Sequence, residues 1–214
     1  MSTPSDPGLG SVADYYSGKI RSHGATPGGV DWNGAEGQHR RFDVLLDVVP
    51  AAMTAPSLDD FGCGYGALLD HLHATGRGAW DYLGFDISEP MIAAAKAHHP
   101  AAQDRFVLGA RSPRRAGFAV ASGIFNVRLD TPLEGWERRI EATLDLLHEG
   151  TTHGFAFNCL TTYSDPPRRK DYLYYGDPCH YFDLCKRRYS RNVALRHDYG
   201  LFEFTVVVRK DPQS

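Results

Sequence analysis

A glycine-rich turn between a short strand and a helix constrains this chain more than any other feature. Residues 58–68 read LDDFGCGYGAL, which places glycines at positions 62, 64 and 66. Glycine adopts backbone angles that other residues avoid, and its missing side chain lets a ligand approach the main chain. The helix expected from Ala67 to His73 has free N–H groups at its start, where polar or anionic ligand groups bind. We therefore expect a bound ligand at this turn.

Two acidic residues stand at the ends of the strands that flank this unit. Asp60 precedes the first glycine by two residues, and Asp86 closes a second expected strand, Tyr82–Phe85. An acid about 20 residues beyond such a turn is typical of proteins that bind a nucleotide ribose. Gly62, Gly64 and Ala67 also satisfy the dinucleotide fingerprint of NAD enzymes, so the residues alone leave the cofactor class open.

The two motifs together resemble those of class I S-adenosylmethionine (SAM)-dependent methyltransferases. The first motif of that family reads hydrophobic, acid, hydrophobic, Gly-x-Gly-x-Gly, and residues 60–66 match it. The second is an acid that closes the next strand, and residues 84–92, GFDISEPMI, look like it. The wider sequence is similar to a bacterial group of such enzymes. The resemblance implies SAM as cofactor and a Rossmann-like α/β fold: a mostly parallel seven-stranded sheet with a C-terminal antiparallel hairpin and helices on both faces.

The resemblance also implies a cofactor site that draws on a leading helix, both motifs and the ends of two later strands. Its expected members are Trp32, Gln38, Arg41, Asp60, Gly62, Cys63, Gly64, Gly66, Asp86, Ile87, Met91, Gly109, Ala110, Phe125 and Asn126. Arg41 could pair with the carboxylate of the cofactor's methionine part. Members of the family often carry an acid after the third strand that bonds the adenine amino group. This chain has Gly109, Ala110 and Arg111 there, so backbone or another residue must make that contact.

Aromatic and polar side chains mark the expected acceptor side of the site. Candidates to bind the acceptor are Tyr15, Tyr16, Asn158, Tyr163, Tyr174 and Tyr175, and candidates to act in catalysis are Asn126, Asn158, Tyr163 and His180. A positively charged sulfur favours aromatic faces nearby, and a base is needed only for an acceptor that starts protonated. The Asn-Pro-Pro-aromatic tetrad of nucleic-acid amino methyltransferases is absent, because Val127 follows Asn126.

We expect residues 1–10 to be disordered and residues 11–214 to form one domain. Within it, helices in 11–50 should cover the pocket, and an insertion at 161–190 should lie on the substrate side. The hydrophobic spacing predicts helices at 12–22, 36–49, 67–73, 89–98, 133–148 and 178–188, and strands at 58–61, 82–85, 106–108, 117–124, 154–159, 192–199 and 201–210.

The composition and net charge of the chain limit the kinds of molecule that it can be expected to bind. The net charge of −3 argues against a broad phosphate-binding surface, so we expect a small-molecule acceptor and no nucleic acid. The basic clusters at 168–170 and 186–188 keep a tRNA acceptor as an alternative, beside a non-catalytic SAM-binding protein and an NAD-dependent oxidoreductase. The four cysteines lack Cys-x-x-Cys spacing, so no metal site is expected. No membrane-spanning run or signal peptide is evident, so we expect a cytoplasmic monomer or homodimer.

Overall fold

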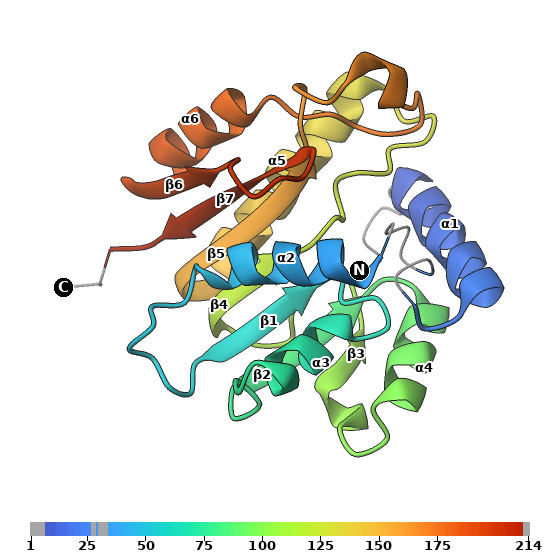
Figure 1. Ribbon diagram of the computed structural model, residues 1–214, viewed down its shortest axis with the longest axis vertical. Coiled ribbons are helices and arrows are strands. Elements are labelled where there is room, and N and C mark those ends of the chain that lie inside the picture. The colour runs from blue at the N-terminus through green and yellow to red at the C-terminus, as the bar shows by residue number, and fades with distance from the viewer. Residues whose placement is uncertain (1–6, 27–28, 30–33, 212–214) are drawn as a thin grey trace, which may run out of the picture.

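The computed structural model describes residues 7–26, 29 and 34–211, and a seven-stranded sheet forms its centre (Figure 1). The strands are β1 (Ser57–Phe61), β2 (Asp81–Asp86), β3 (Phe106–Leu108), β4 (Ala116–Ala121), β5 (Thr151–Leu160), β6 (Asn192–Arg196) and β7 (Glu203–Arg209). Their order is β3-β2-β1-β4-β5-β7-β6. Strands β1 to β5 are parallel, while β7 runs antiparallel to both β5 and β6. The expected sheet and its closing hairpin are confirmed.

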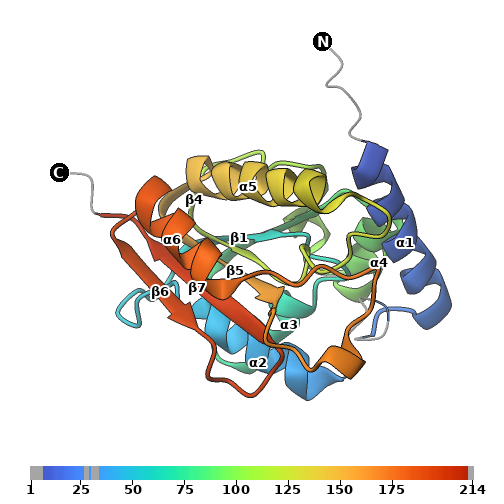
Figure 2. The ribbon, with the colours of Figure 1, turned by 90° about the horizontal axis from the view of Figure 1, so that it is seen from above.

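Helices cover both faces of the sheet. They are α1 (Pro7–His23), α2 (Ala35–Leu46), α3 (Ala67–Ala74), α4 (Glu89–His98), α5 (Leu133–Glu149) and α6 (Pro178–Arg188). Figure 2 shows α5 and α6 on one side of the strands and α2 and α3 on the other. Alternation along the strands explains the two layers: Leu58 and Val120 join the core under α2 and α3, whereas Ala119 and Ala121 join the core under α5. Among the described residues, no helix is long and apolar enough to cross a bilayer.

Helices α4 and α6 each begin directly after a residue whose side chain caps the N-terminus of the helix. The Ser88 hydroxyl accepts a hydrogen bond from the Met91 N–H at the start of α4 (3.3 Å). The Asp177 carboxylate accepts one from the Cys179 N–H at the start of α6 (2.8 Å). Each cap satisfies N–H groups that have no partner within the helix. Because these caps are local, both helix starts were predictable from the sequence.

The start of the chain differs from expectation. Helix α1 begins at Pro7, so residues 7–10 are helical rather than disordered, while residues 1–6 lie outside the described part. Proline suits a first helical turn because its missing N–H would have no partner there.

The fourth strand is also shorter than predicted. It ends at Ala121 rather than at residue 124, because Gly123 adopts a positive φ of 73° and turns the chain. The Gly123 N–H donates to the Asn158 side-chain oxygen (2.7 Å) instead of to a neighbouring strand. In the closing hairpin, residues 197–202 form the connection and Gly200 has a φ of 72°. The first strand therefore ends at residue 196 rather than 199, and the second begins at 203 rather than 201.

The crossover from β3 to β4 contains no helix. Residues 109–115 pass across the sheet face, held by Arg114 and Ser112. The Arg114 guanidinium bonds the buried Asp59 carboxylate (2.8 Å) and the Asp81 carboxylate (2.7 Å), and the Ser112 hydroxyl donates to Asp59 (2.5 Å). This short crossing leaves room on the sheet face beside α5, where a cavity lies.

We predict that Arg114→Ala destabilises the fold by about 2–4 kcal/mol, because it leaves the Asp59 carboxylate buried without its guanidinium partner. Urea denaturation would measure the change. Arg187→Ala is the matched control, since the exposed pair of Arg187 with Asp183 should contribute less than about 1 kcal/mol. Equal losses for the two variants would contradict the role given to Arg114.

Candidate functional site

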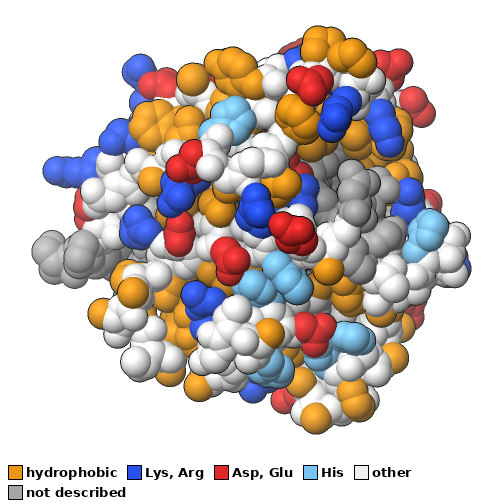
Figure 3. All heavy atoms as spheres, in the orientation of Figure 1, with side chains coloured by type: hydrophobic (Ala, Val, Ile, Leu, Met, Phe, Trp, Pro, Cys, Tyr) orange, Lys and Arg blue, Asp and Glu red, His pale blue; other side chains and the backbone are white. Residues whose placement is uncertain are grey.

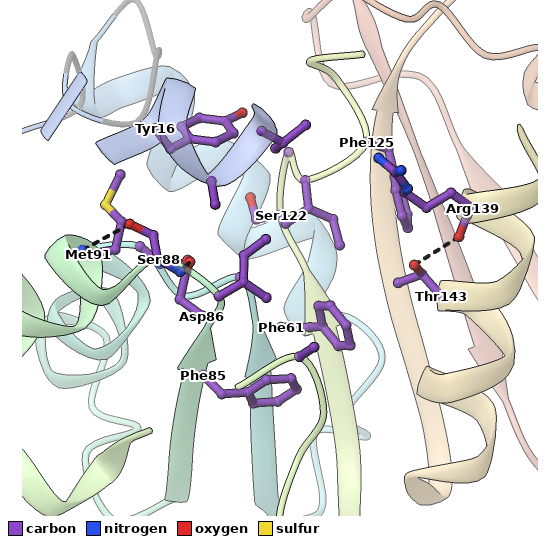
Figure 4. Close-up of a pocket in the computed structure, with 18 of the residues that line it drawn as sticks. Tyr16, Phe61, Phe85, Asp86, Ser88, Met91, Ser122, Phe125, Arg139 and Thr143 are labelled. Atoms are coloured by element: carbon purple, nitrogen blue, oxygen red, sulfur yellow. Dashed lines mark hydrogen bonds between the residues drawn. The ribbon is translucent and has the colours of Figure 1, made fainter. Parts of the chain in front are cut away.

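A first cavity, of about 300 Å³, lies at the carboxyl ends of the parallel strands (Figure 4). Its wall comes from the segments that follow β1, β2, β3 and β4, together with α1 and α5. Ligands of open α/β sheets bind at this edge, next to the point where the strand order reverses. Here the order reverses between β1 and β4, and the cavity lies there.

Among the described residues that line the first cavity, Asp86 is the acidic one. One oxygen accepts the Ser88 N–H (2.8 Å) and the other accepts the Gly64 N–H (3.1 Å). Burial raises the pKa of the Asp86 carboxyl above its ordinary value, and these backbone donors offset only part of that rise by favouring the charged form. The carboxylate therefore ties the glycine turn to the end of β2. Each oxygen has further lone pairs that can accept hydrogen bonds from a ligand.

The glycine turn brings the main chain to the cavity wall. Gly62 has a φ of 75°, and a Cβ placed on it would lie 2.4 Å from the Ile124 side chain. No other residue fits that position without displacing Ile124. The neighbouring wall is mainly apolar and includes Phe85, Ile87, Met91 and Ile124. Such walls suit a flat ring system.

Helix α1, near the N-terminus of the chain, forms one part of the wall of the first cavity. Its residues Val12, Ala13 and Tyr16 line the cavity, and Figure 4 shows Tyr16 above Asp86 and Ser88. The Ser17 and Ser88 hydroxyls form a buried hydrogen bond of 2.9 Å. Because Ser88 also caps α4, this bond connects α1 to the segment that carries Asp86.

A second cavity, of about 800 Å³, adjoins the first. The walls of the two cavities share Tyr16 and Gly123. The remaining wall comes from the start of α2, the segment after β4, residues 160–175 and the connection between β6 and β7. The second cavity is larger and carries more polar and charged side chains.

The segment after β5 is held over the second cavity by main-chain contacts. The Tyr174 N–H donates to the Asn126 carbonyl oxygen (2.8 Å), and the Arg128 guanidinium donates to the carbonyl of residue 171 (2.6 Å). The Tyr15 and Tyr172 rings approach to 6.4 Å between centroids, which brings α1 against this segment. Residues far apart in the sequence therefore enclose one space.

A buried polar network supports the floor between the cavities. The Asn158 side-chain oxygen accepts the Gly123 N–H, and its amide group donates to Glu203 (3.0 Å). Arg41 binds both oxygens of Glu203, at 2.7 and 2.8 Å. Asn158 and Glu203 are almost fully buried, so each partner satisfies a group that would be costly to leave alone.

Many of the predicted site residues lie in these walls. The first cavity is lined by the expected residues Gly62, Gly64, Asp86, Ile87, Met91, Gly109, Ala110 and Phe125. The second is lined by the expected residues Arg41, Asn126 and Tyr175, and Tyr16 belongs to both. Within the second cavity, Arg41 is bound to Glu203 rather than offered to a cofactor carboxylate.

Other predicted residues lie outside both walls, and their contacts explain why. The Asp60 carboxylate faces α3 and accepts from the Tyr82 hydroxyl (2.8 Å), because strand alternation turns it away from Phe61 and the cavity. Gln38 accepts from the Tyr65 hydroxyl, Cys63 is buried against Gly84, and Gly66 precedes α3 against Phe106. Trp32 lies outside the described residues.

The same holds for several acceptor-side candidates. Asn158 is buried in the network below the cavities. Tyr174 is buried and its hydroxyl lies 2.8 Å from that of Tyr181. Tyr163 is 68% exposed beside His197 and His180 is exposed beside Tyr181, so neither reaches the cavities. Tyr15 contacts Tyr172 from outside the wall.

Several wall residues were not predicted from the sequence. They are Val12, Ala13, Ser88, Ser122, Ile124, Trp136, Arg139 and Thr143 in the first cavity, and Arg40, Arg168, Lys170, Tyr172 and Phe202 in the second. Arg139 and Thr143 belong to α5, whose apolar spacing indicated only a core-facing helix. The cations 168 and 170 form part of a charge run that is more often a solvated surface.

Charged side chains of both signs are intermixed on the face shown in Figure 3. No continuous basic stretch covers the part of that face whose residues are described. A nucleic-acid surface is expected to gather lysines and arginines along one face.

Comparisons with known proteins agree with this geometry. A family model described as "Methyltransferase domain" matches residues 60–119. A Mycobacterium tuberculosis protein, "Putative methyltransferase Rv1506c", is 56% identical over 155 residues, which cover 72% of this chain and 93% of that protein.

Two solved structures share the fold over nearly the whole chain. Magnesium protoporphyrin IX methyltransferase of Synechocystis with bound SAM has a TM-score of 0.66 at 14% identity, and the match covers 98% of this chain and 100% of that one. The complex of DhpI with SAH has a TM-score of 0.63 at 16% identity, with the same coverage. At these identities the likeness extends to the fold alone.

The buried Asp60 predicts a distinctive pH dependence of stability. Burial raises the pKa of this carboxyl from 3.8 to about 7. The folded chain thus binds the Asp60 proton more tightly than the unfolded chain, so its contribution is full below about pH 4 and is lost as pH rises toward 7. Relative to Asp60→Asn, the natural chain should lose up to about 1.4 kcal/mol per pH unit across this window. Urea denaturation at several pH values tests this, and parallel profiles for the two proteins would refute it.

Proposed function

Because this chain belongs to the methyltransferase family, we propose that it transfers a methyl group from SAM to an oxygen or nitrogen of a small-molecule acceptor. The observation that carries the proposal is the pair of adjoining cavities joined at Tyr16 and Gly123. One has walls suited to a nucleoside, and the other offers a separate, larger space. A protein that only held a cofactor would have no use for the second cavity.

The first cavity fits the nucleoside of SAM by its donor set and shape. Asp86 can accept hydrogen bonds from two ribose hydroxyls, and its own backbone partners fix its orientation. Phe85, Ile87, Met91 and Ile124 supply apolar surface for the adenine. The main chain of 109–110 lines the same cavity and is the source we propose for contacts to the adenine edge.

SAM, when bound, supplies a methyl carbon that is activated by its positively charged sulfur. The protein's own contribution is to hold an acceptor atom in line with that carbon, which can lower the barrier by several kcal/mol. Tyr16 lies where the two cavities meet, so its ring can face the sulfonium.

The alternatives receive less support. An NAD-binding domain is not expected to end in the antiparallel β6–β7 hairpin. A tRNA acceptor would favour a continuous basic face, and the described face in Figure 3 mixes charges of both signs. A small acceptor would fit in the second cavity, whose wall includes Tyr16, the start of α2 and residues of the 160–175 segment.

We predict that Asp86→Ala weakens SAM binding by roughly ten- to a hundredfold, because a hydrogen bond to a charged group contributes about 1.5–3 kcal/mol. Calorimetric titration with SAM measures the loss. Asp81→Ala is the matched control, since Asp81 starts the same strand at the opposite end and bonds Arg114. Tight binding of NAD with no binding of SAM would refute the cofactor assignment.

The acceptor class is tested by turnover with methyl-labelled SAM. A bacterial small-molecule extract and total tRNA would be incubated separately with the enzyme, and label in each would be counted. We expect label in the small-molecule extract alone. Label confined to tRNA would replace this proposal with its alternative.

A further inference from the structure

Two histidines and an aspartate from α3 and α4 bring their side chains together. Asp70 belongs to the first turn of α3, and His98 and His99 stand at the end of α4. A carboxylate oxygen and two ring nitrogens from these residues all lie within 4.8 Å of one another. Figure 3 shows histidine side chains close together in the region where α3 and α4 lie in Figure 1. None of the three residues lines either cavity, so the cluster is separate from the site described above.

The Asp70 carboxylate faces both histidines, one with each oxygen. Its Oδ2 lies 2.7 Å from Nε2 of His98, and its Oδ1 lies 3.8 Å from Nε2 of His99. Ligand atoms at the corners of a tetrahedral zinc site, with bonds of about 2.0–2.1 Å, are about 3.3 Å apart. The two observed separations lie on either side of that value. The side chains of Asp70 and His98 are 49% and 37% exposed, so small rotations of these two can bring all three ligand atoms around one ion.

The end of α4 directs two adjacent imidazole rings toward the same carboxylate. Consecutive residues inside a helix point about 100° apart. His99 departs from the helical conformation, with φ of −119° and ψ of 67°. The centroids of the His98 and His99 rings are 4.7 Å apart, with an angle of 87° between the ring planes. The break in the helix therefore supplies two nitrogen ligands from neighbouring positions.

The ring of His99 is fixed in place by its surroundings. Its side chain is only 8% exposed and stacks on Phe106, with 5.2 Å between centroids. Its Nε2 lies 3.1 Å from the carbonyl oxygen of Gly66, at the end of the glycine turn. An ion bound here takes the lone pair of Nε2, and the neutral ring then carries its proton on Nδ1. The Gly66 carbonyl or a water can complete the coordination.

We propose that Asp70, His98 and His99 bind a divalent transition metal of the zinc class. Imidazole nitrogens with a carboxylate oxygen suit zinc, whereas magnesium and calcium prefer oxygen ligands alone. The spacing of the cysteines argued against a zinc site built on cysteines, and this cluster uses none. The bound ion joins α3, which follows the glycine turn, to α4, which follows Asp86, and thereby stabilises the folded chain. The inference does not depend on methyl transfer.

Zinc titration of the chelator-treated chain, without a histidine tag, tests the site. Calorimetry should show one zinc ion per chain with a Kd tighter than about 100 μM. Zinc at a hundred times its Kd should raise the Tm by roughly 5–10 °C, because the ion binds the folded chain in preference to the unfolded one. The same concentration of magnesium should leave the Tm unchanged.

Matched variants locate the ion. Asp70→Asn and His98→Gln each remove one ligand at an exposed position, and each should weaken zinc binding about tenfold or more and reduce the zinc-induced rise in Tm. Melting without metal checks that both variants are folded. The control is His23→Gln with His153→Gln, which removes two exposed histidines elsewhere in the chain and should bind zinc as the natural chain does.

Two outcomes would overturn the inference. The first is zinc binding weaker than about 100 μM, which would leave the three side chains with ordinary hydrogen bonds and no ion. The second is equal zinc affinity in the natural chain, the ligand variants and the control, which would place the ion elsewhere. Because the readouts are metal binding and melting, neither outcome bears on the proposed methyl transfer.

Discussion

The Asp86 carboxylate is the interaction on which the architecture of the site depends. It accepts N–H groups from the glycine turn and from the residue that caps α4, so one side chain fixes the ends of β1 and β2 relative to each other. The Ser17–Ser88 hydroxyl pair extends this connection to α1. A side chain that holds two strand ends and a covering helix in place is also the one best positioned to bind a ribose.

A second group of side-chain contacts connects the elements on the other half of the sheet. The chain of contacts from Gly123 through Asn158 and Glu203 to Arg41 joins β4, β5, β7 and α2. A buried carboxylate needs such partners, because burial without them is costly. Within this network Arg41 and Asn158 bind the Glu203 carboxylate, which lines the second cavity.

Much of the fold was predictable because its signals are local. The glycine turn, the Ser88 cap and the apolar spacing of α5 each depend on residues close in sequence, and the observed elements agree with them. The two leading motifs also identified Gly62, Gly64, Asp86, Ile87 and Met91 in the wall of the first cavity. Asp60 is the instructive exception: the motif suggested a ligand, whereas alternation along β1 directs its side chain toward Tyr82 and away from the cavity.

The second cavity was much less predictable, because it is assembled from distant segments. Residues 168–170 resemble a solvated charge run in sequence, and they enter the wall only because the following residues return to Asn126 and Val127. Tyr163 and His180 have suitable chemistry, yet the same fold leaves them exposed. Residue type could suggest such candidates, but long-range contacts decided which of them line the cavity.

A crystal structure with S-adenosylhomocysteine bound would test the two-cavity account most directly. The account predicts the ribose hydroxyls on Asp86, the adenine between the apolar walls of the first cavity, and the sulfur at the junction of Tyr16 and Gly123, facing the second cavity. A sulfur directed away from the second cavity, or a ligand bound elsewhere, would contradict it.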